Sequence, residues 1–144
     1  MITYSDNISV DNYNEIRKSV GWNMITSDTA KIGLNNSICF VALDSRKPIA
    51  LARIINNGGN ISCIYDVIVL PKYQKKGIGT ELMNRVIDYI RNHLKDDEKH
   101  LVCLTATKDK EGFYKRFGFR ERPKYSSGAG MYQWIKRAPK LIKN

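Results

Sequence analysis

Apolar and polar positions alternate with different periods along the chain, and each period predicts a secondary-structure element. Apolar and β-prone residues at positions 2–5 predict a short first strand. A helical stripe of apolar residues then begins at Ser9 or Asp11, either of which can cap the helix, and runs to about Val20. A second, shorter helix is expected over residues 27–34.

The centre of the chain changes to a strand-like pattern. Three β-prone apolar runs predict strands, at residues 37–44, 48–56 and 61–70. The segment DSRK joins the first two runs as a hairpin, and NNGGN between the second and third runs is a strong turn signal. These three strands are therefore expected to be antiparallel to their neighbours.

Helical spacing returns at Ile78, from which the apolar residues form one stripe as far as Leu94. A further strand, a short helix and a last strand are then expected, at residues 100–106, 112–118 and 130–137. Because a helix connects the third and fourth central strands, these two should be parallel. The pattern predicts a single α/β domain over residues 1–144, with a mixed antiparallel and parallel sheet flanked by helices.

The composition is that of a globular chain, with 144 residues of which 42% are hydrophobic and 26% are charged. No apolar run reaches the roughly 20 residues of a membrane helix, and the first residues are polar, so we expect a cytoplasmic protein without a membrane partner. The two histidines flank a charged turn, which predicts no zinc site.

The three cysteines, Cys39, Cys63 and Cys103, form no close pair in the sequence, and each lies in an apolar run. We therefore expect buried, reduced side chains rather than a disulfide or a metal site.

Lysine and arginine exceed aspartate and glutamate by 24 − 14 = 10 charges. Much of the excess lies in three segments, at residues 72–76, 108–124 and 136–143. Such a balance is typical of proteins that bind nucleic acids, acidic membrane surfaces or anionic small molecules. Charge alone does not choose among these partners, and a solvated basic face without a specific partner stays an alternative.

The segment QKKGIGT, residues 74–80, joins the third central strand to the long helix. The first amides of a helix lack intrahelical acceptors, and the helix dipole adds partial positive charge there. A phosphate at this end accepts several of these amides at once, and Gly77 and Gly79 allow the backbone to approach it closely. With the Thr80 hydroxyl and two lysines beside it, the junction is expected to bind a pyrophosphate.

The chain contains neither the GxxxxGK[ST] string of P-loop proteins nor a complete GxGxxG dinucleotide fingerprint. The pattern Q-x-x-G-x-G at residues 74–79, after a strand and before a helix, resembles the acetyl-CoA loop of the GNAT superfamily of N-acetyltransferases. Residues 112–119, GFYKRFGF, are similar to the FYxxxGF signature of the same family. More loosely, the tail segment SSGAGMYQWI is similar to a subgroup with bacterial proteins and plant serotonin N-acetyltransferases.

The resemblance implies an enzyme that transfers the acetyl group of acetyl-CoA directly to a primary amine, without a metal ion and without a nucleic-acid partner. It implies that the strand before the loop separates from the next parallel strand, and that its freed backbone groups bind the pantetheine arm of coenzyme A. The cofactor-binding residues expected on this basis are Val67, Ile68, Val69, Gln74, Lys75, Lys76, Gly77, Ile78, Gly79 and Thr80.

Tyr114 matches the family position that donates a proton to the coenzyme A sulfur. A phenol with an ordinary pKa of about 10 is protonated at neutral pH and can serve as this acid. The alternative is a tyrosine that only packs beside Phe113 and Phe117. Lys108, Lys110 and Arg116 are further candidates, as contacts for the adenosine phosphates.

The general base stays open at this point. Asp66 and its neighbour Tyr65 lie on the strand before the loop, and simple alternation places their side chains on opposite faces of the sheet. Asp66 can also orient the substrate ammonium or cap a sheet edge, and water can deprotonate the amine instead.

The acceptor stays open as well. The resemblance implies that residues 10–36 and the loop 122–131 form its site, and aromatic residues in or next to these segments (Trp22, Tyr125 and Tyr132) suit an aryl amine, ordinary packing or a dimer interface equally. A polyamine, an amino sugar, an aminoglycoside and a protein terminus are alternatives. An acyl-CoA sensor without turnover and, less favoured, a basic nucleic-acid-binding module also stay open, as does a homodimer.

Overall fold

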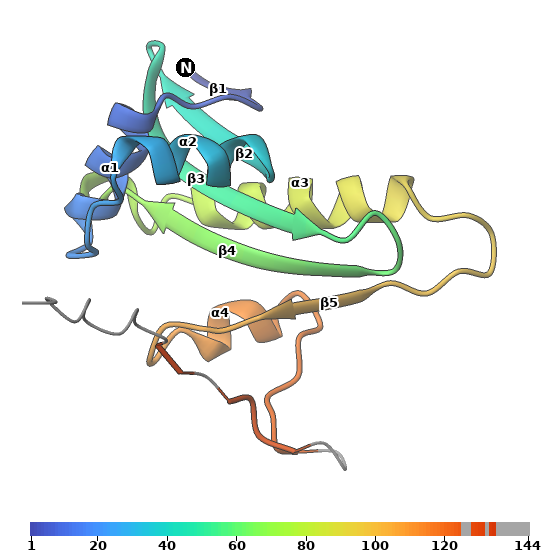
Figure 1. Ribbon diagram of the computed structural model, residues 1–144. Helices are drawn as coiled ribbons and strands as arrows, with labels where there is room; N and C mark the ends of the chain where they lie inside the picture. The colour runs from blue at the N-terminus through green and yellow to red at the C-terminus, as the bar shows by residue number, and fades with distance from the viewer. Residues whose placement is uncertain (125–127, 132, 135–144) are drawn as a thin grey trace, which may run out of the picture. The chain divides into compact units, whose positions relative to one another are not determined.

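The computed structural model describes residues 1–124, 128–131, 133 and 134, which fall into two compact units, residues 1–105 and the described residues from 106 onward (Figure 1). The first unit contains, in chain order, β1 (Ile2–Ser5), α1 (Val10–Ser19), α2 (Ser27–Asn35), β2 (Ile38–Asp44), β3 (Lys47–Asn56), β4 (Ile61–Val69), a 3-10 turn (Pro71–Tyr73), α3 (Ile78–Asn92) and β5 (Leu101–Leu104). The second contains α4 (Glu111–Lys115).

The first unit is built on a five-stranded sheet in the order β1-β2-β3-β4-β5. The pairs from β1 to β4 are antiparallel and β4 pairs with β5 in parallel, which confirms the predicted mixed sheet. Ser45 and Arg46 turn the β2–β3 hairpin with positive φ angles of 48° and 69°. Two successive positive φ values match the twist of the flanking strands.

Helices cover both faces of this sheet. The helices α1 and α2 pack on the face formed by β2, β3 and β4, while α3 packs on the opposite face (Figure 1). Tyr13 and Ile16 of α1 are buried against Leu51 and Ile68. On the other side the predicted stripe of α3 is buried, with Leu82 fully inaccessible. No helix among the described residues is long and apolar enough to cross a membrane.

The predicted helices and central strands are confirmed, with ends that differ from the predicted ones by up to three residues. Ser9 caps α1, where its hydroxyl oxygen accepts a bond from the amide of Asn12. The strand β5 has four residues instead of the seven expected at 100–106. The prediction of a last strand at 130–137 is not confirmed: residues 130, 131, 133 and 134 are not in a strand, and the others lie outside the described residues.

The prediction that all three cysteines are buried is wrong for one of them. Cys39 is buried, Cys63 is partly buried and Cys103 is exposed. The reason is that α1 and α2 pack on β2, β3 and β4, whereas Cys103 projects from β5, the last strand in the order of this sheet.

A β-bulge interrupts β4 at Asp66, a few residues before the glycine loop. Tyr65 lies opposite Arg53, and Ile68 lies opposite Leu51, so two residues of β4 face one residue of β3 between these pairs. Asp66 has a φ of +52°, a left-handed conformation that non-glycine residues rarely adopt. A bulge of this kind bends a strand and redirects a side chain.

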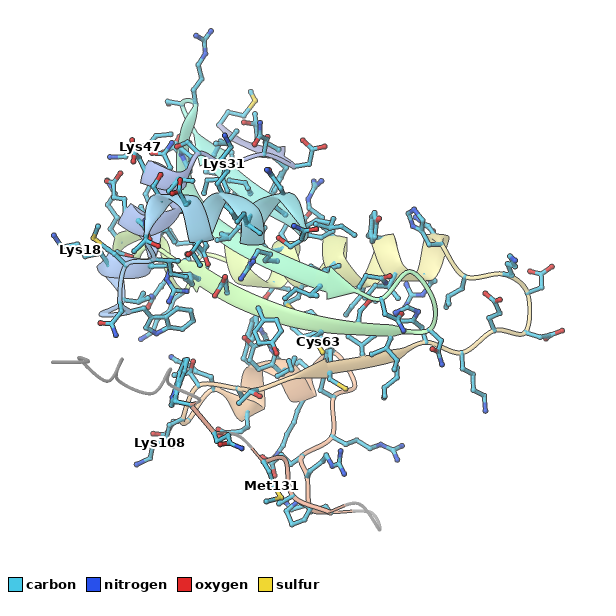
Figure 2. The ribbon with its side chains drawn as sticks, in the orientation of Figure 1. Lys18, Lys31, Lys47, Cys63, Lys108 and Met131 are labelled. Atoms are coloured by element: carbon cyan, nitrogen blue, oxygen red, sulfur yellow. The ribbon has the colours of Figure 1, made fainter. Side chains whose placement is uncertain are left out.

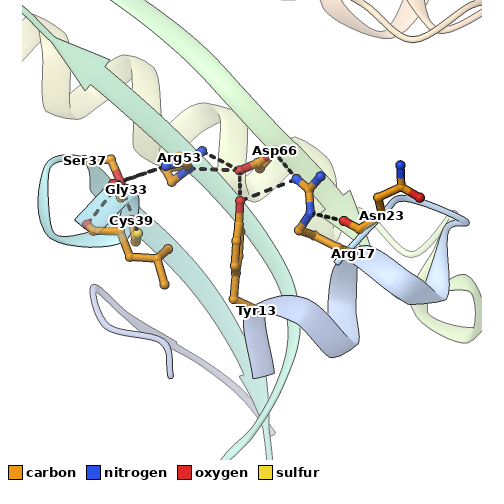
Figure 3. Close-up of polar contacts among 9 residues, drawn as sticks. Tyr13, Arg17, Asn23, Gly33, Ser37, Cys39, Arg53 and Asp66 are labelled. Carbon is orange, nitrogen blue, oxygen red and sulfur yellow. Dashed lines mark hydrogen bonds and ion pairs between the residues drawn. The ribbon is translucent and has the colours of Figure 1, made fainter. Parts of the chain in front are cut away.

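A buried polar cluster surrounds the Asp66 carboxylate (Figure 3). The Tyr13 hydroxyl donates to Oδ2 of Asp66 at 2.6 Å, Arg53 Nε donates to the same oxygen at 2.9 Å, and Arg17 Nη1 donates to Oδ1 at 3.1 Å. The Asp66 side chain is only 8% exposed. The cluster therefore ties α1, β3 and the bulge in β4 together through one carboxylate.

The two arginines of this cluster reach further elements. Arg53 Nη1 donates to the carbonyl of Gly33 in α2 at 3.2 Å, and Arg17 Nε donates to the carbonyl of Asn23 at 2.9 Å. The Arg17 guanidinium also lies over the ring of Trp22, 5.3 Å from its centroid. These bonds satisfy donors that would otherwise be costly to bury.

We expect Asp66→Asn to lower the free energy of unfolding by about 3–5 kcal/mol, because it leaves two buried guanidinium groups without their carboxylate. Asparagine tolerates the left-handed backbone, so the loss reports the charge. Denaturation by urea measures it. The matched control is Asp88→Asn, which breaks an exposed ion pair with Arg91 and should cost less than about 1 kcal/mol. Equal stability of the two variants would contradict the cluster's role.

Stability should also depend on alkaline pH through Tyr13. Burial, and then the bond to Asp66, raise the pKa of Tyr13 to about 12. Because an unfolded tyrosine loses its proton near pH 10, the folded state binds more protons above that pH, so this stabilisation is complete below about pH 10 and is lost as the pH rises toward 12. Between these pH values, the free energy of unfolding of Tyr13→Phe should fall less steeply with pH than that of the wild type, by up to about 1.4 kcal/mol per pH unit.

Urea denaturation between pH 8 and about pH 12 measures this difference. At neutral pH, Tyr13→Phe should cost about 1.5–3 kcal/mol, the value of a hydrogen bond to a charged group. The control is Tyr65→Phe, which changes a half-exposed tyrosine on the same sheet and should leave the pH profile as in the wild type. A Tyr13→Phe profile parallel to the wild-type curve would show that the Tyr13 proton is not held by the fold.

Candidate functional site

The predicted glycine loop forms the start of α3. After β4 ends at Val69 and the 3-10 turn closes, Gly77 becomes the N-cap of the helix with a φ of +82°. An added Cβ at Gly77 would meet nothing within 4 Å. This position therefore favours glycine because of its positive φ angle and not because neighbouring atoms leave no room for a side chain. The first intrahelical bond runs from the amide of Glu81 to the carbonyl of Gly77, at 3.0 Å. The amides of Ile78 and Gly79 precede this bond at the helix end, as the predicted anion site requires.

Gln74 closes the loop onto the end of β4. Its side-chain amide donates to the carbonyl of Val69 at 3.0 Å, and its backbone amide donates to the carbonyl of Pro71 at 3.2 Å. These two bonds fix the distance between the end of the strand and the start of the helix. They also occupy the carbonyl of Val69, one of the backbone groups expected to face the pantetheine arm.

Pairing between β4 and β5 covers only part of β4. The parallel register joins Ile61–Ile64 to Leu101–Leu104, whereas β4 continues to Val69. Within the described residues, the segment 65–69 is thus paired with β3 only, and Val67, Ile68 and Val69 lie in it. The family resemblance implied a strand that leaves its parallel neighbour before the loop, and the register agrees with that expectation.

Three lysines, Lys72, Lys75 and Lys76, lie in or beside the loop. Two of them make cation–π contacts with Tyr73: the ammonium groups of Lys72 and Lys76 lie 5.1 and 5.6 Å from the ring centroid. The Tyr73 hydroxyl itself donates to Asp44 at 2.8 Å, and this bond lowers the pKa of the Asp44 carboxyl. Lys75 adopts a φ of +58°. None of the three lysines forms an ion pair with another described residue.

The acid nearest in sequence to these lysines is already neutralised. Glu81, in the first turn of α3, forms an ion pair with Arg85 at 2.9 Å. The loop therefore combines a helix N-terminus with unpaired positive charge, an arrangement that favours a multiply charged anion.

The two candidate bases lie on β4, and the structure changes their interpretation. Because directly opposed residues project from one face, Tyr65 shares the face of Arg53, to which Asp66 is bonded. The prediction that Tyr65 and Asp66 point to opposite faces is wrong, since the bulge breaks the alternation. The Asp66 carboxylate is held by Arg17, Arg53 and Tyr13, whereas the Tyr65 side chain is 47% exposed.

Tyr114 lies in the second unit, on α4. Its ring makes edge contacts with Phe113 at 5.0 Å and Phe119 at 6.3 Å between centroids. Burial raises the pKa of Tyr114 above its ordinary value, so the phenol is protonated at neutral pH. Within its unit, the hydroxyl has no hydrogen-bond partner among the described residues. Tyr114 therefore packs against aromatic rings, as the alternative role predicted, and it also has a hydroxyl that is able to donate a proton.

The other basic candidates also lie in this unit. Lys108 and Lys110 are exposed, and Lys108 is labelled in Figure 2. Arg116 lies over the rings of Phe113 and Phe117, at 5.1 and 5.8 Å from their centroids. Contacts with adenosine phosphates stay a prediction for all three.

The segment 10–36, where the acceptor was expected to bind, consists of α1, α2 and the turn between them. Trp22 is partly buried against the core, whereas Met24 is 62% exposed. Tyr125, Tyr132 and the basic tail at 136–143 lie outside the described residues. The expected loop at 122–131 is described only in part.

Sequence reasoning missed the cluster around Asp66. A signal was present, because Arg53 and Asp66 each interrupt an apolar strand of the predicted antiparallel pair. Opposite charges in buried neighbouring strands are expected to pair. Their partners Tyr13 and Arg17 come from a helix far away in the sequence, and no local pattern identifies them. Asp44 and Tyr73 are a second pair that only the fold brings together.

Sequence comparison identifies related proteins. Residues 8–119 match the family model described as the acetyltransferase (GNAT) family. An uncharacterized N-acetyltransferase (ycf52) of Pyropia yezoensis is 27% identical over 136 residues, which cover 91% of this chain and 76% of that protein. A chloroplastic serotonin N-acetyltransferase 2 of Oryza sativa is 26% identical over 134 residues, covering 90% of this chain and 65% of that protein.

Solved structures agree with the fold. A probable acetyltransferase of Staphylococcus aureus has a TM-score of 0.82 and 28% identity, covering 94% of this chain and all of that one. A predicted acetyltransferase of Clostridium acetobutylicum, solved with acetyl-CoA, has a TM-score of 0.67 and 20% identity, covering 87% of this chain and 94% of that one. The matched range contains both predicted motifs and all of the central strands. On these grounds, the chain belongs to the GNAT family of acetyltransferases.

Proposed function

We propose that this chain transfers the acetyl group of acetyl-CoA directly to a primary amine of a small molecule. The observation that carries the proposal is the start of α3: a left-handed glycine N-cap that follows β4 and the 3-10 turn, with two leading amides and three unpaired lysines beside them. In a GNAT chain, the pyrophosphate of acetyl-CoA is the anion that this arrangement suits. The relative solved with acetyl-CoA supports the same donor.

The remaining parts of the coenzyme are assigned in the same way. Residues 74–80 bind the pyrophosphate through backbone amides, the Thr80 hydroxyl and the lysine side chains. The backbone of Val67–Val69, apart from the Val69 carbonyl that Gln74 occupies, binds the pantetheine arm, and this segment lies beyond the part of β4 paired with β5. Alignment of the thioester along this strand brings its carbonyl to a fixed position for attack.

The reaction joins a neutral amine to the thioester carbonyl and releases coenzyme A. The amine nitrogen attacks the carbonyl carbon, the carbon–sulfur bond breaks, and the leaving thiolate takes a proton. In this proposal Tyr114 donates that proton, since burial keeps its phenol protonated. Because Asp66 is bound by two arginines and a tyrosine, we assign deprotonation of the amine to water or to Tyr65 rather than to Asp66.

The proposal does not assign the kind of primary amine. A test panel of aryl amines, polyamines, amino sugars and aminoglycosides identifies it. The similarity to a plant protein named serotonin N-acetyltransferase favours including aryl-alkyl amines. A cytoplasmic location and a homodimer stay predictions.

We expect Gly77→Glu to weaken acetyl-CoA binding by at least about 100-fold, because it places a carboxylate where the pyrophosphate would bind. Isothermal titration calorimetry with acetyl-CoA measures the dissociation constant. The matched control is Gly58→Glu in the β3–β4 turn: Gly58 has a φ of +78° and open space around it, so the substitution adds the same charge and the same backbone strain elsewhere. Equal affinities of the two variants would contradict the assignment of the loop.

We expect Tyr114→Phe to lower kcat by about 100-fold while acetyl-CoA affinity changes little, because the substitution removes only the proton donor. Release of coenzyme A thiol, followed across the amine panel, measures turnover. Tyr89→Phe, which changes a partly buried tyrosine of α3, is the control and should retain wild-type activity. A Tyr114→Phe enzyme with wild-type kcat would show that another group protonates the thiolate. Binding of acetyl-CoA without turnover of any amine would instead favour a sensor.

A further inference from the structure

Two free cysteines lie opposite each other in the parallel pair of β4 and β5. The register pairs Cys63 of β4 directly with Cys103 of β5, and both thiols are free. The position of Cys63 on β4, where that strand runs beside β5, is labelled in Figure 2. Far apart in the sequence, the two residues thus become nearest neighbours in the fold.

The spacing of paired strands suits a covalent bond between these residues. Hydrogen-bonded strands lie about 4.7–4.9 Å apart, and disulfides join residues whose Cα atoms are about 4.4–6.8 Å apart. Directly opposed residues also project from the same face of the sheet, so the two Cβ atoms point the same way. A disulfide needs Cβ atoms about 3.5–4.5 Å apart, so a small approach of the two strands brings the sulfur atoms within bonding reach.

The two thiols differ in their surroundings. Cys103 is exposed and so is open to oxidants in solution, whereas Cys63 is partly buried. Burial, and next the neighbouring Cys103, raise the pKa of the Cys63 thiol. The third cysteine, Cys39, is buried on β2 near Ser37.

We propose that Cys63 and Cys103 form an oxidation site that closes to an intrachain disulfide in the presence of a peroxide. The Cys103 thiolate attacks the peroxide, which breaks the oxygen–oxygen bond and leaves a sulfenic acid and one molecule of water. The Cys63 sulfur then attacks the Cys103 sulfur, forms the disulfide and releases a second water. Two thiols and one hydrogen peroxide thus give one disulfide and two waters, with two electrons passing from sulfur to oxygen.

The bond would form at a defined place in the fold. The β4–β5 pairing ends at Ile64 and Leu104, one residue beyond the two cysteines. A disulfide there would fix the two strands at the point where they part. Because the exposed sulfur is accessible, reducing thiols should open the bond again.

The test treats the full-length chain with a small excess of hydrogen peroxide and then digests it with trypsin without reduction. The sequence places Cys63 in the tryptic peptide 54–72 and Cys103 in the peptide 100–108, with Cys39 in neither. We expect a covalent pair of these two peptides, the loss of two hydrogen atoms from the intact mass, and one remaining titratable thiol. Excess reduced glutathione should restore the two separate peptides.

Single variants provide the controls. Cys103→Ser should abolish the linked peptide and leave Cys63 reduced, while Cys39→Ala should keep the linked peptide. Should Cys39→Ala fold poorly, the peptide map of the wild-type chain still distinguishes the three cysteines. Oxidation of Cys103 to sulfinic acid while Cys63 stays free would overturn the proposal, as would linkage of either cysteine to Cys39 or only between chains.

Discussion

The carboxylate of Asp66 is the single group on which the arrangement of the first unit depends. It accepts bonds from a tyrosine and two arginines, and through them it joins α1, α2, β3 and β4. A buried ion cluster contributes little net stability when complete, but the loss of one member is costly. The cluster therefore acts less as a source of stability than as a constraint, because its bonds hold the left-handed residue of β4 in place.

This constraint reaches the proposed coenzyme site through the strand. The bulge lies between the end of the β4–β5 pairing at Ile64 and the last residues of β4, which lead into the Gln74 turn and α3. A change in the bulge would shift Val67–Val69 by one register position and would turn every following side chain to the other face. Asp66 thus affects the proposed chemistry by placing the backbone, and its own carboxylate is occupied.

Sequence reasoning predicted what depends on local signals. The Ser45–Arg46 hairpin, the apolar stripe of α3 and the junction of residues 74–80 with the start of α3 follow from turn chemistry and helical spacing within a few residues, whereas the left-handed cap at Gly77 was not predicted. The bulge at Asp66 was not predicted, because its partners Tyr13 and Arg17 come from α1, a helix far away in the sequence that packs on β3 and β4. The register that opposes Cys63 and Cys103 was not predicted either, since strand pairing over a crossover helix has no local signal that fixes it to one residue. The single domain over residues 1–144 stays a prediction.

The excess of positive charge indicates a binding site only after the cations that form ion pairs with carboxylates have been set apart from those that do not. Lys47, Lys115 and Arg91, among others, form ion pairs with carboxylates, so their charge is locally balanced. Lys72, Lys75 and Lys76 form no ion pair within the part of the chain that the structure describes, and Glu81 beside them is bound to Arg85. The unpaired charge of these three lysines therefore lies beside the N-terminus of α3, where the helix dipole adds to it. An extended polyanion such as a nucleic acid is recognised by basic residues spread along a face or a helix, whereas three lysines beside a helix N-terminus suit a compact pyrophosphate.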